Sequence, residues 1–333
     1  MDALAQALAA SPALFPHNLD VDKGTISLVE MDGAAYRAAS FLDARILSPK
    51  TVSRVVPWSA VETATAGLPE ACDFIFHIGH VGSTLLSRLM GAHPAVFALR
   101  EPLALRTLAQ MRIDGRGDPM AYLPTLLKLW SRTFHPGQRA IVKATSFASE
   151  FAPDILAQPY CPKAIFMAVT AETYLASILA GPNSRQEARM LGATRYARLS
   201  KRVGKPVPQP ASEGELIAMS WACEMGALDA ANAQDRVLHL DFDQFLADPQ
   251  SALAACFNHS GIAATDGEIG AILSGHDMRT YSKAQEYDYD TKLRRDVLDQ
   301  ARRQHGAQIG RGLVWLEKMG LPSDKGGSSP PTR

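Results

Sequence analysis

The stretch from residue 73 to residue 102 constrains the fold more than any other part of the chain. Residues 74–76 (Phe-Ile-Phe) form a short aromatic and β-branched run, which is typical of a buried strand. Residues 79–82 (Gly-His-Val-Gly) predict a tight turn, because glycine adopts backbone conformations that side chains forbid. A serine and a threonine then precede apolar residues at helical spacing, so residues 83–90 are expected to begin a helix.

A strand followed by a glycine turn and a helix N-terminus is an arrangement that binds anions. Several backbone N–H groups and the helix dipole point to one place, where phosphate is the usual ligand. A tight turn without a ligand is the alternative. The phosphate loop of ATP and GTP hydrolases has four residues between its glycines and a lysine after them, whereas here two residues separate the glycines and no lysine follows. The missing lysine, and the lack of an obvious acidic pair for Mg²⁺, also disfavour a small-molecule kinase.

The composition excludes several other classes. Lys plus Arg and Asp plus Glu number 34 each, so nothing global indicates a nucleic-acid partner or an anionic membrane. The four cysteines lie far apart without paired spacing, which favours buried thiols in a reducing compartment over a metal site or a disulfide framework. The N-terminus lacks a basic signal region, and no apolar run approaches the roughly 20 residues that span a bilayer. We therefore expect a soluble, cytoplasmic protein with no membrane span and no metal.

The order of the expected elements indicates an α/β protein. Strands are expected at residues 25–29, 74–78, 95–99, 140–143, 163–169 and 236–240. From the second of these onward they alternate with helical segments, which predicts a P-loop-type three-layer sandwich with a central, mostly parallel sheet and helix-rich insertions. Residues 1–70 are expected to be an accessory N-terminal segment that carries no chemistry, residues 71–320 the P-loop domain, and residues 321–333 a disordered tail.

A parallel sheet binds ligands at the carboxyl ends of its strands. The glycine turn, Glu101 and Lys143 all follow expected strands directly, and so do Val169 and Thr170. We therefore expect these positions, which are far apart in sequence, to meet at one edge of the sheet.

Residues 79–86 resemble the 5′-phosphosulfate loop of the sulfotransferase superfamily, loosely Gly-x-(Arg/Lys)-Ser-Gly-(Ser/Thr)-Thr-(Leu/Trp)-Leu, and residues 92–102 resemble bacterial members of that family. The resemblance implies transfer of a sulfuryl group from PAPS (3′-phosphoadenosine-5′-phosphosulfate) to an acceptor hydroxyl or amine. PAPS would be the co-substrate, and a small molecule or carbohydrate the acceptor. The resemblance assigns the 5′-phosphate to the loop residues Gly79, His80, Val81, Gly82, Ser83 and Thr84. Ser83 could instead be only the N-cap of its helix.

The resemblance also suggests two catalytic residues. Glu101 stands where sulfotransferases that act on carbohydrate or tyrosine have a glutamate general base; the alternative is a surface carboxylate paired with Arg100. His80 stands where the family usually has Lys or Arg, and it could donate to the bridging oxygen if it is protonated; the alternative is a turn histidine that faces solvent. Lys143 could add positive charge near the sulfuryl group or could simply be solvated.

The fourth strand of this region departs from the family. Ser177 matches the family's 3′-phosphate serine, but Val169-Thr170-Ala171 replaces the usual Arg-Asp-Pro. The cation for the 3′-phosphate would then have to come from elsewhere, and the candidates are Arg185, Arg189, Arg279 and Lys283. This departure keeps a second hypothesis open, a lapsed P-loop protein that binds a nucleotide or phosphometabolite. The identity of the acceptor and the oligomeric state are not encoded in any pattern of the sequence.

Overall fold

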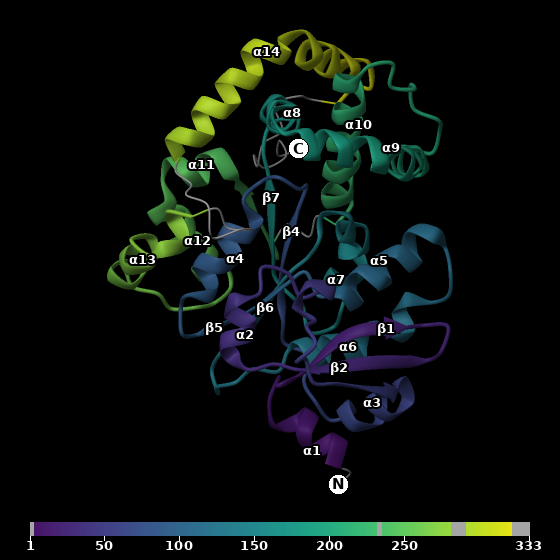
Figure 1. Ribbon diagram of the computed structural model, residues 1–333, viewed down its shortest axis with the longest axis vertical. Coiled ribbons are helices and arrows are strands. Elements are labelled where there is room, and N and C mark those ends of the chain that lie inside the picture. Colours follow the sequence, from purple (N-terminus) through teal and green to yellow (C-terminus); the bar gives the residue numbers. More distant parts are fainter. Residues whose placement is uncertain (1–2, 232–234, 281–290, 322–333) are drawn as a thin grey trace.

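The computed structural model describes residues 3–231, 235–280 and 291–321 (Figure 1). Its central feature is a five-stranded sheet in the order β5-β6-β4-β7-β8, in which every neighbouring pair is parallel. The strands are β4 (Asp73–His77), β5 (Val96–Arg100), β6 (Arg139–Lys143), β7 (Ala164–Ala168) and β8 (Val237–Asp241). The predicted α/β class is confirmed, and the strand that precedes the glycine turn is central as expected.

Helices cover both faces of this sheet, as a strand with all five residues buried requires. One face carries α4 (Ser83–Gly91) and α12 (Pro249–His259), which contact each other and the strands. The other face carries η3 (Ser146–Phe151), α7 (Ala152–Leu156) and α10 (Glu213–Ala230), with α5 (Leu103–Asp114) packed on η3. Figure 1 shows these two helical layers on either side of β4 and β7.

The N-terminal segment forms a second, antiparallel sheet of β1 (Leu14–Asp20), β2 (Thr25–Glu30) and β3 (Ser53–Pro57), with helices α1 (Ala3–Ala10), α2 (Gly33–Ala38) and α3 (Trp58–Thr65) and the short turn η1 (Ala44–Ile46). Of these three strands, the sequence predicted only β2. Pro16 lies within β1, where a proline is tolerated because β1 is an edge strand and its register shifts just after that residue. The hydrophobic core continues without a break from this segment to the central sheet.

Two buried arginines attach the N-terminal segment to the central sheet. Arg100 donates from Nε to the carbonyl of Ala39 at 2.7 Å and from Nη2 to the carbonyl of Arg37 at 2.9 Å. Arg88 of α4 donates from Nη2 to Oγ of Ser40 at 2.8 Å. Burial lowers the pKa of Arg100 to about 10. The alternative in which Glu101 is a surface carboxylate paired with Arg100 is therefore wrong, because the Arg100 guanidinium binds the end of α2.

The remaining helices are mostly inserted after the sheet strands. They are η2 (Pro119–Ala121), α6 (Leu123–Trp130), α8 (Ala171–Ala180), α9 (Pro182–Val203), α11 (Phe242–Ala247), α13 (Asp266–Leu273), η4 (His276–Met278) and α14 (Thr291–Lys318). After Asp118 the chain makes the 3₁₀ turn η2 and then continues into α6. In Figure 1, α14 arches over the top of the molecule, and it packs on α8 and α10. Over the described ranges, no helix combines the length and apolar character needed to cross a membrane.

Candidate functional site

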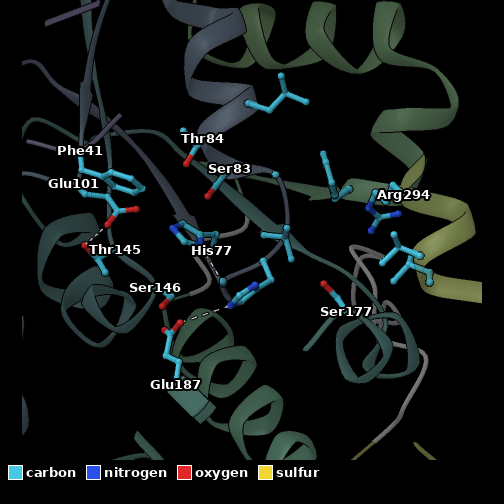
Figure 2. Close-up of a pocket in the computed structure, with 18 of the residues that line it drawn as sticks. Phe41, His77, Ser83, Thr84, Glu101, Thr145, Ser146, Ser177, Glu187 and Arg294 are labelled. Atoms are coloured by element: carbon cyan, nitrogen blue, oxygen red, sulfur yellow. Dashed lines mark hydrogen bonds and ion pairs between the residues drawn. The ribbon is translucent and has the colours of Figure 1, made fainter. Parts of the chain in front are cut away.

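A cavity of about 770 Å³ opens at the carboxyl ends of the central strands. Its lining includes the whole loop from Gly79 to Thr84, together with Glu101 and Ser177. Figure 2 shows Phe41 and Glu101 on one side of the cavity and Ser177 and Arg294 on the other, with the loop between them. The loop and Glu101, which were expected to meet at one edge of the sheet, therefore line the same cavity, and Ser177, which the family resemblance indicated, lines it as well.

Three of the four residues from Gly79 to Gly82 have a left-handed backbone conformation. Gly79, His80 and Gly82 have φ angles of 85°, 57° and 67°, in the left-handed region. Gly82 occupies the N-cap position of α4, so Ser83 is the first helical residue and its hydroxyl is not the cap. The left-handed form costs a residue with a side chain roughly 1–2 kcal/mol. Such strain at His80 is common where a binding site fixes the backbone.

Gly82 is also required by packing. A Cβ atom added there would lie 2.1 Å from the ring of Phe242, the first residue of α11. That distance is far below contact, and Phe242 is buried. Gly82 therefore lets α11 close against the start of α4, in addition to adopting the left-handed conformation.

His77, the last residue of β4, connects the loop to the end of β6 through hydrogen bonds of its ring. Its Nε2 lies 2.9 Å from the carbonyl oxygen of Ala144, which can only accept, and its Nδ1 lies 2.9 Å from the backbone N–H of Gly79, which can only donate. These two bonds fit the neutral ring with its hydrogen on Nε2. His77 lines the cavity, and the sequence analysis did not include it because its role comes from its contact with the end of β6.

Thr84 provides the clearest sign of a ligand. Its Oγ1 is buried and finds no hydrogen-bond partner among the described residues, yet the side chain lines the cavity. Figure 2 shows it beside Ser83 at the start of α4. A buried hydroxyl without a partner costs about 1–3 kcal/mol, which a ligand oxygen would recover.

Glu101 is held by three hydrogen bonds. Nζ of Lys143 donates to Oε1, and Oγ1 of Thr145 donates to Oε2 at 3.0 Å. The backbone N–H of Glu101 donates to the carbonyl of Lys143 at 2.7 Å, and its φ is 53°. Lys143 is fully buried, so the alternative of a solvated lysine is wrong. Glu101 is also buried, so the alternative of a surface carboxylate is wrong as well.

His80 faces a carboxylate that sequence analysis missed. Nε2 of His80 lies 3.9 Å from Oε2 of Glu187 on α9, an ion pair when the ring is protonated. The His80 side chain is 25% exposed and lines the cavity, so it does not simply face bulk solvent. No local motif marks Glu187, which follows the loop by more than a hundred residues.

The cations proposed for a 3′-phosphate lie elsewhere. Arg185 and Arg189 donate to the Glu213 carboxylate at 2.5 Å and 2.6 Å and do not line the cavity, so as candidates they are wrong. Arg279 donates to the carbonyl of Ser274 at 3.2 Å and is also outside the lining. Lys283 lies outside the described residues. The tail predicted at residues 321–333 is likewise outside them, except for residue 321.

Val169 cannot provide such a contact either. It is buried, and its carbonyl accepts a hydrogen bond of 3.1 Å from Nε1 of Trp221. Arg294 of α14 does line the cavity, on the side of Ser177 (Figure 2). Its Nη1 donates to Oδ1 of Asp243 at 2.5 Å. Its guanidinium lies 5.0 Å from the centre of the Phe242 ring.

Arg195 of α9 is a second arginine in the lining that the sequence did not single out. It is buried, and its Nε donates to Oε1 of Glu224 at 3.2 Å. Burial alone would raise the pKa of Glu224, but Arg198 and Arg195 hold it below its usual range. Arg195 is thus a cation fixed by a fully buried carboxylate.

Comparison with known proteins returns no matching family model and no matching curated protein. Three of the similar solved structures show the range of the likeness. The sulfotransferase domain from the curacin biosynthetic pathway is 16% identical, over 77% of this chain and 99% of that domain, with a TM-score of 0.41. The sulfotransferase from Alicyclobacillus acidocaldarius is 13% identical, over 76% and 96%, with a TM-score of 0.38. Mouse sulfotransferase SULT7A1 complexed with PAP is 14% identical, over 74% and 85%, with a TM-score of 0.41.

These neighbours are sulfotransferases, the family that the sequence resembles. At such identities and TM-scores the likeness carries no argument about activity, which has to come from the chain's own site. In the part of the chain that the structure describes, no group of three or more His, Cys, Asp or Glu side chains is arranged to hold a metal ion.

Proposed function

We propose that the chain is a sulfotransferase that moves a sulfuryl group from PAPS to an acceptor hydroxyl or amine. The observation that carries the proposal is the unpartnered, buried Oγ1 of Thr84 at the start of α4, in the same cavity as Glu101. A left-handed glycine loop at a helix N-terminus suits a phosphate. A carboxylate fixed beside it suits proton transfer from an acceptor.

Two groups of hydrogen-bond donors line the cavity, and each would bind one phosphate of the nucleotide. The loop from Gly79 to Thr84 supplies backbone N–H groups and two hydroxyls for the 5′-phosphate. On the far side, Ser177 and Arg294 are available for the 3′-phosphate in place of the family's arginine. PAPS itself supplies the sulfuryl group and the phosphate leaving group.

Glu101 and His80 would then divide the proton chemistry. The Glu101 carboxylate takes the proton from the acceptor as the new oxygen–sulfur bond forms. Its bonds from Lys143 and Thr145 hold it in one orientation, which preserves the reacting geometry. His80 donates a hydrogen bond to the bridging oxygen as the bond between that oxygen and sulfur breaks, and Glu187 stabilises the protonated ring.

The second candidate is a protein of the same fold that binds a nucleotide or phosphometabolite without transfer. The observation that favours it is Val169, whose buried position removes the usual arginine contact. This second function requires the loop and Thr84 but does not require Glu101. The two functions therefore agree on binding and differ on turnover.

Calorimetric titration of the full chain with PAP (3′-phosphoadenosine 5′-phosphate) tests both. We expect one site per chain, and failure of PAP to bind would contradict the sulfotransferase proposal. Labelled PAPS with a panel of phenols, sugars and hydroxylated lipids then tests transfer. Binding of PAP without transfer to any acceptor would favour the second candidate.

A further inference from the structure

The cavity wall next to Glu101 is basic and aromatic. Phe41, Arg45 and Arg106 all line it, from the N-terminal segment and from α5. The Arg45 guanidinium lies 3.5 Å from the centre of the Phe41 ring, and Nζ of Lys143 lies 5.9 Å from the same centre. Since Lys143 bonds to Glu101, the Phe41 ring lies near both the Arg45 guanidinium and the Glu101 pair.

The two arginines share one carboxylate. Arg45 donates to Asp43 from Nε at 2.8 Å and from Nη2 at 2.5 Å, and Arg106 donates to it from Nη1 at 3.4 Å. Burial would raise the pKa of Asp43, but the hydrogen bonds from Arg45 hold it below its usual range. Asp43 is therefore ionised at neutral pH, and two guanidinium groups with one carboxylate leave the cluster of Asp43, Arg45 and Arg106 positively charged.

The cluster is open on the side of the cavity. The Arg45 side chain is 57% exposed and that of Arg106 is 36% exposed, whereas Asp43 is buried. The segment that carries Phe41 is firmly held. The backbone N–H of Leu42 donates to the carbonyl of Arg100 at 2.7 Å, and the Arg100 guanidinium binds the preceding carbonyls. The charged wall thus keeps a fixed place beside Glu101.

We propose that Arg45 and Arg106 bind an anionic group, a carboxylate, sulfate or phosphate, on the acceptor, while Phe41 packs against its body. The inference rests on the proposed sulfotransferase function and adds the class of acceptor. Guanidinium groups bind such oxyanions through charge-assisted hydrogen bonds, and Arg45 and Arg106 would use the N–H groups that do not bond to Asp43. Phe41 lies across the cavity from Ser177 and Arg294 (Figure 2), so we expect this wall not to compete for the nucleotide's 3′-phosphate.

A matched pair of small phenols tests this inference directly. The full chain is titrated by calorimetry with 4-hydroxybenzoate and, separately, with 4-hydroxybenzamide, which has nearly the same shape and no charge. We expect the acid to bind more tightly. Arg45→Gln and Arg106→Gln should each weaken binding of the acid by about 10-fold and leave the amide unchanged, since each removes a hydrogen bond to a charged group.

Arg112→Gln is the matched control. Arg112 lies on α5 like Arg106, but it bonds to Asp154 and does not line the cavity. The Arg112→Gln variant should bind the acid with the affinity of the wild type. Arg45→Lys keeps the positive charge but lacks the planar guanidinium donors. Its affinity for the acid should lie between those of the wild type and of Arg45→Gln. Thermal melts of each variant confirm that the fold is retained.

The outcomes separate this inference from the proposed function. Equal binding of acid and amide, no binding of the acid, or full binding in both glutamine variants would overturn the inference. Arginine-dependent binding of the acid supports it even if PAP does not bind, in which case the sulfotransferase proposal alone fails. With PAPS present, kcat/KM for the acid should fall in the two variants while PAP affinity stays unchanged.

Discussion

The two ends of the cavity are built in different ways. The loop end is one continuous run, in which residues 77–84 set their own geometry through left-handed backbone angles and the bond between His77 and Gly79. The side of the cavity opposite Glu101 is assembled from separate helices, with Ser177 on α8 and with Arg294 on α14, which bonds to Asp243 of α11. A local signal can reveal the first end, but only tertiary contacts create the second.

This difference also sets what each end can tolerate. At the loop end the glycines are confined by φ and by the contact of Gly82 with Phe242. At the other end the pair of Arg294 with Asp243 is partly open, and open ion pairs contribute little to stability. A ligand phosphate can therefore replace Asp243 as the partner of Arg294 at low cost. We expect substitutions at the loop end to have the larger effects.

The largest effect is expected at Glu101, which follows β5 directly and faces the loop end. Glu101→Gln keeps the size and polarity but removes the proton acceptor, so turnover should fall by about 10²–10⁴-fold. PAP affinity should barely change, because the proposed role of this side chain is toward the acceptor and not toward the nucleotide. Steady-state kinetics with labelled PAPS and calorimetry with PAP measure the two quantities. Wild-type turnover in this variant would remove Glu101 from the mechanism.

The next largest effect is expected at Thr84. Thr84→Val keeps the shape and removes a hydroxyl that has no partner among the described residues, so PAP affinity should fall about 10- to 100-fold. The ligand-free protein should become more stable by about 1 kcal/mol, because an unpaired buried polar atom is lost. Ser87→Ala is the control. Ser87 is on the same helix and equally unpartnered within the described ranges, but it does not line the cavity. An equal loss of affinity in both variants would show that the effect is structural.

The sequence was sufficient for the loop and the sheet because their signals are local. The strand at 74–78, the glycine turn and the helix from Ser83 follow from side-chain type over a few residues, and Glu101 follows from its place after a strand. β1 was not among the expected strands, because a proline such as Pro16 interrupts the hydrogen bonds of a strand unless that strand lies at an edge of its sheet. Proline alone does not show whether its strand lies at an edge.

Several of the assignments that the structure does not support concern long charged side chains. Arg185 and Arg189 were candidates for a phosphate, but Glu213 at the start of α10 binds both. Arg100 was the partner of Glu101 in the alternative interpretation, but it binds the end of α2, more than sixty residues earlier. The partner of such a side chain depends on which elements pack together. For the same reason the sequence did not indicate Arg45 or Arg294, and the N-terminal segment was expected to carry no chemistry although Phe41 lines the cavity.

A smaller effect is expected at the assembled end. Arg294→Gln should weaken PAP binding by about 10-fold, since it removes a charge-assisted hydrogen bond to the 3′-phosphate. Affinity for 5′-AMP, which lacks that phosphate, should change little. Arg279→Gln is the control, because Arg279 is outside the lining. Equal losses for PAP and 5′-AMP would place the effect of Arg294 elsewhere than at the 3′-phosphate.

The smallest effect is expected where the ion pairs lie away from both ends of the cavity. The hydrogen bond from Arg185 is the main cause that holds the pKa of Glu213 below its usual value of 4.5, and Arg189 adds to it. Because the pKa is lower in the folded state, the ion pair stabilises the protein at neutral pH, and this contribution is lost as the pH falls below 4.5 through the lowered pKa. Glu213→Gln should cost about 0–1 kcal/mol at pH 7, with the gap to wild type closing in acid, as urea denaturation at several pH values measures. PAP affinity should stay within about twofold, since neither arginine lines the cavity, and a larger loss of affinity would return Arg185 and Arg189 to the nucleotide site.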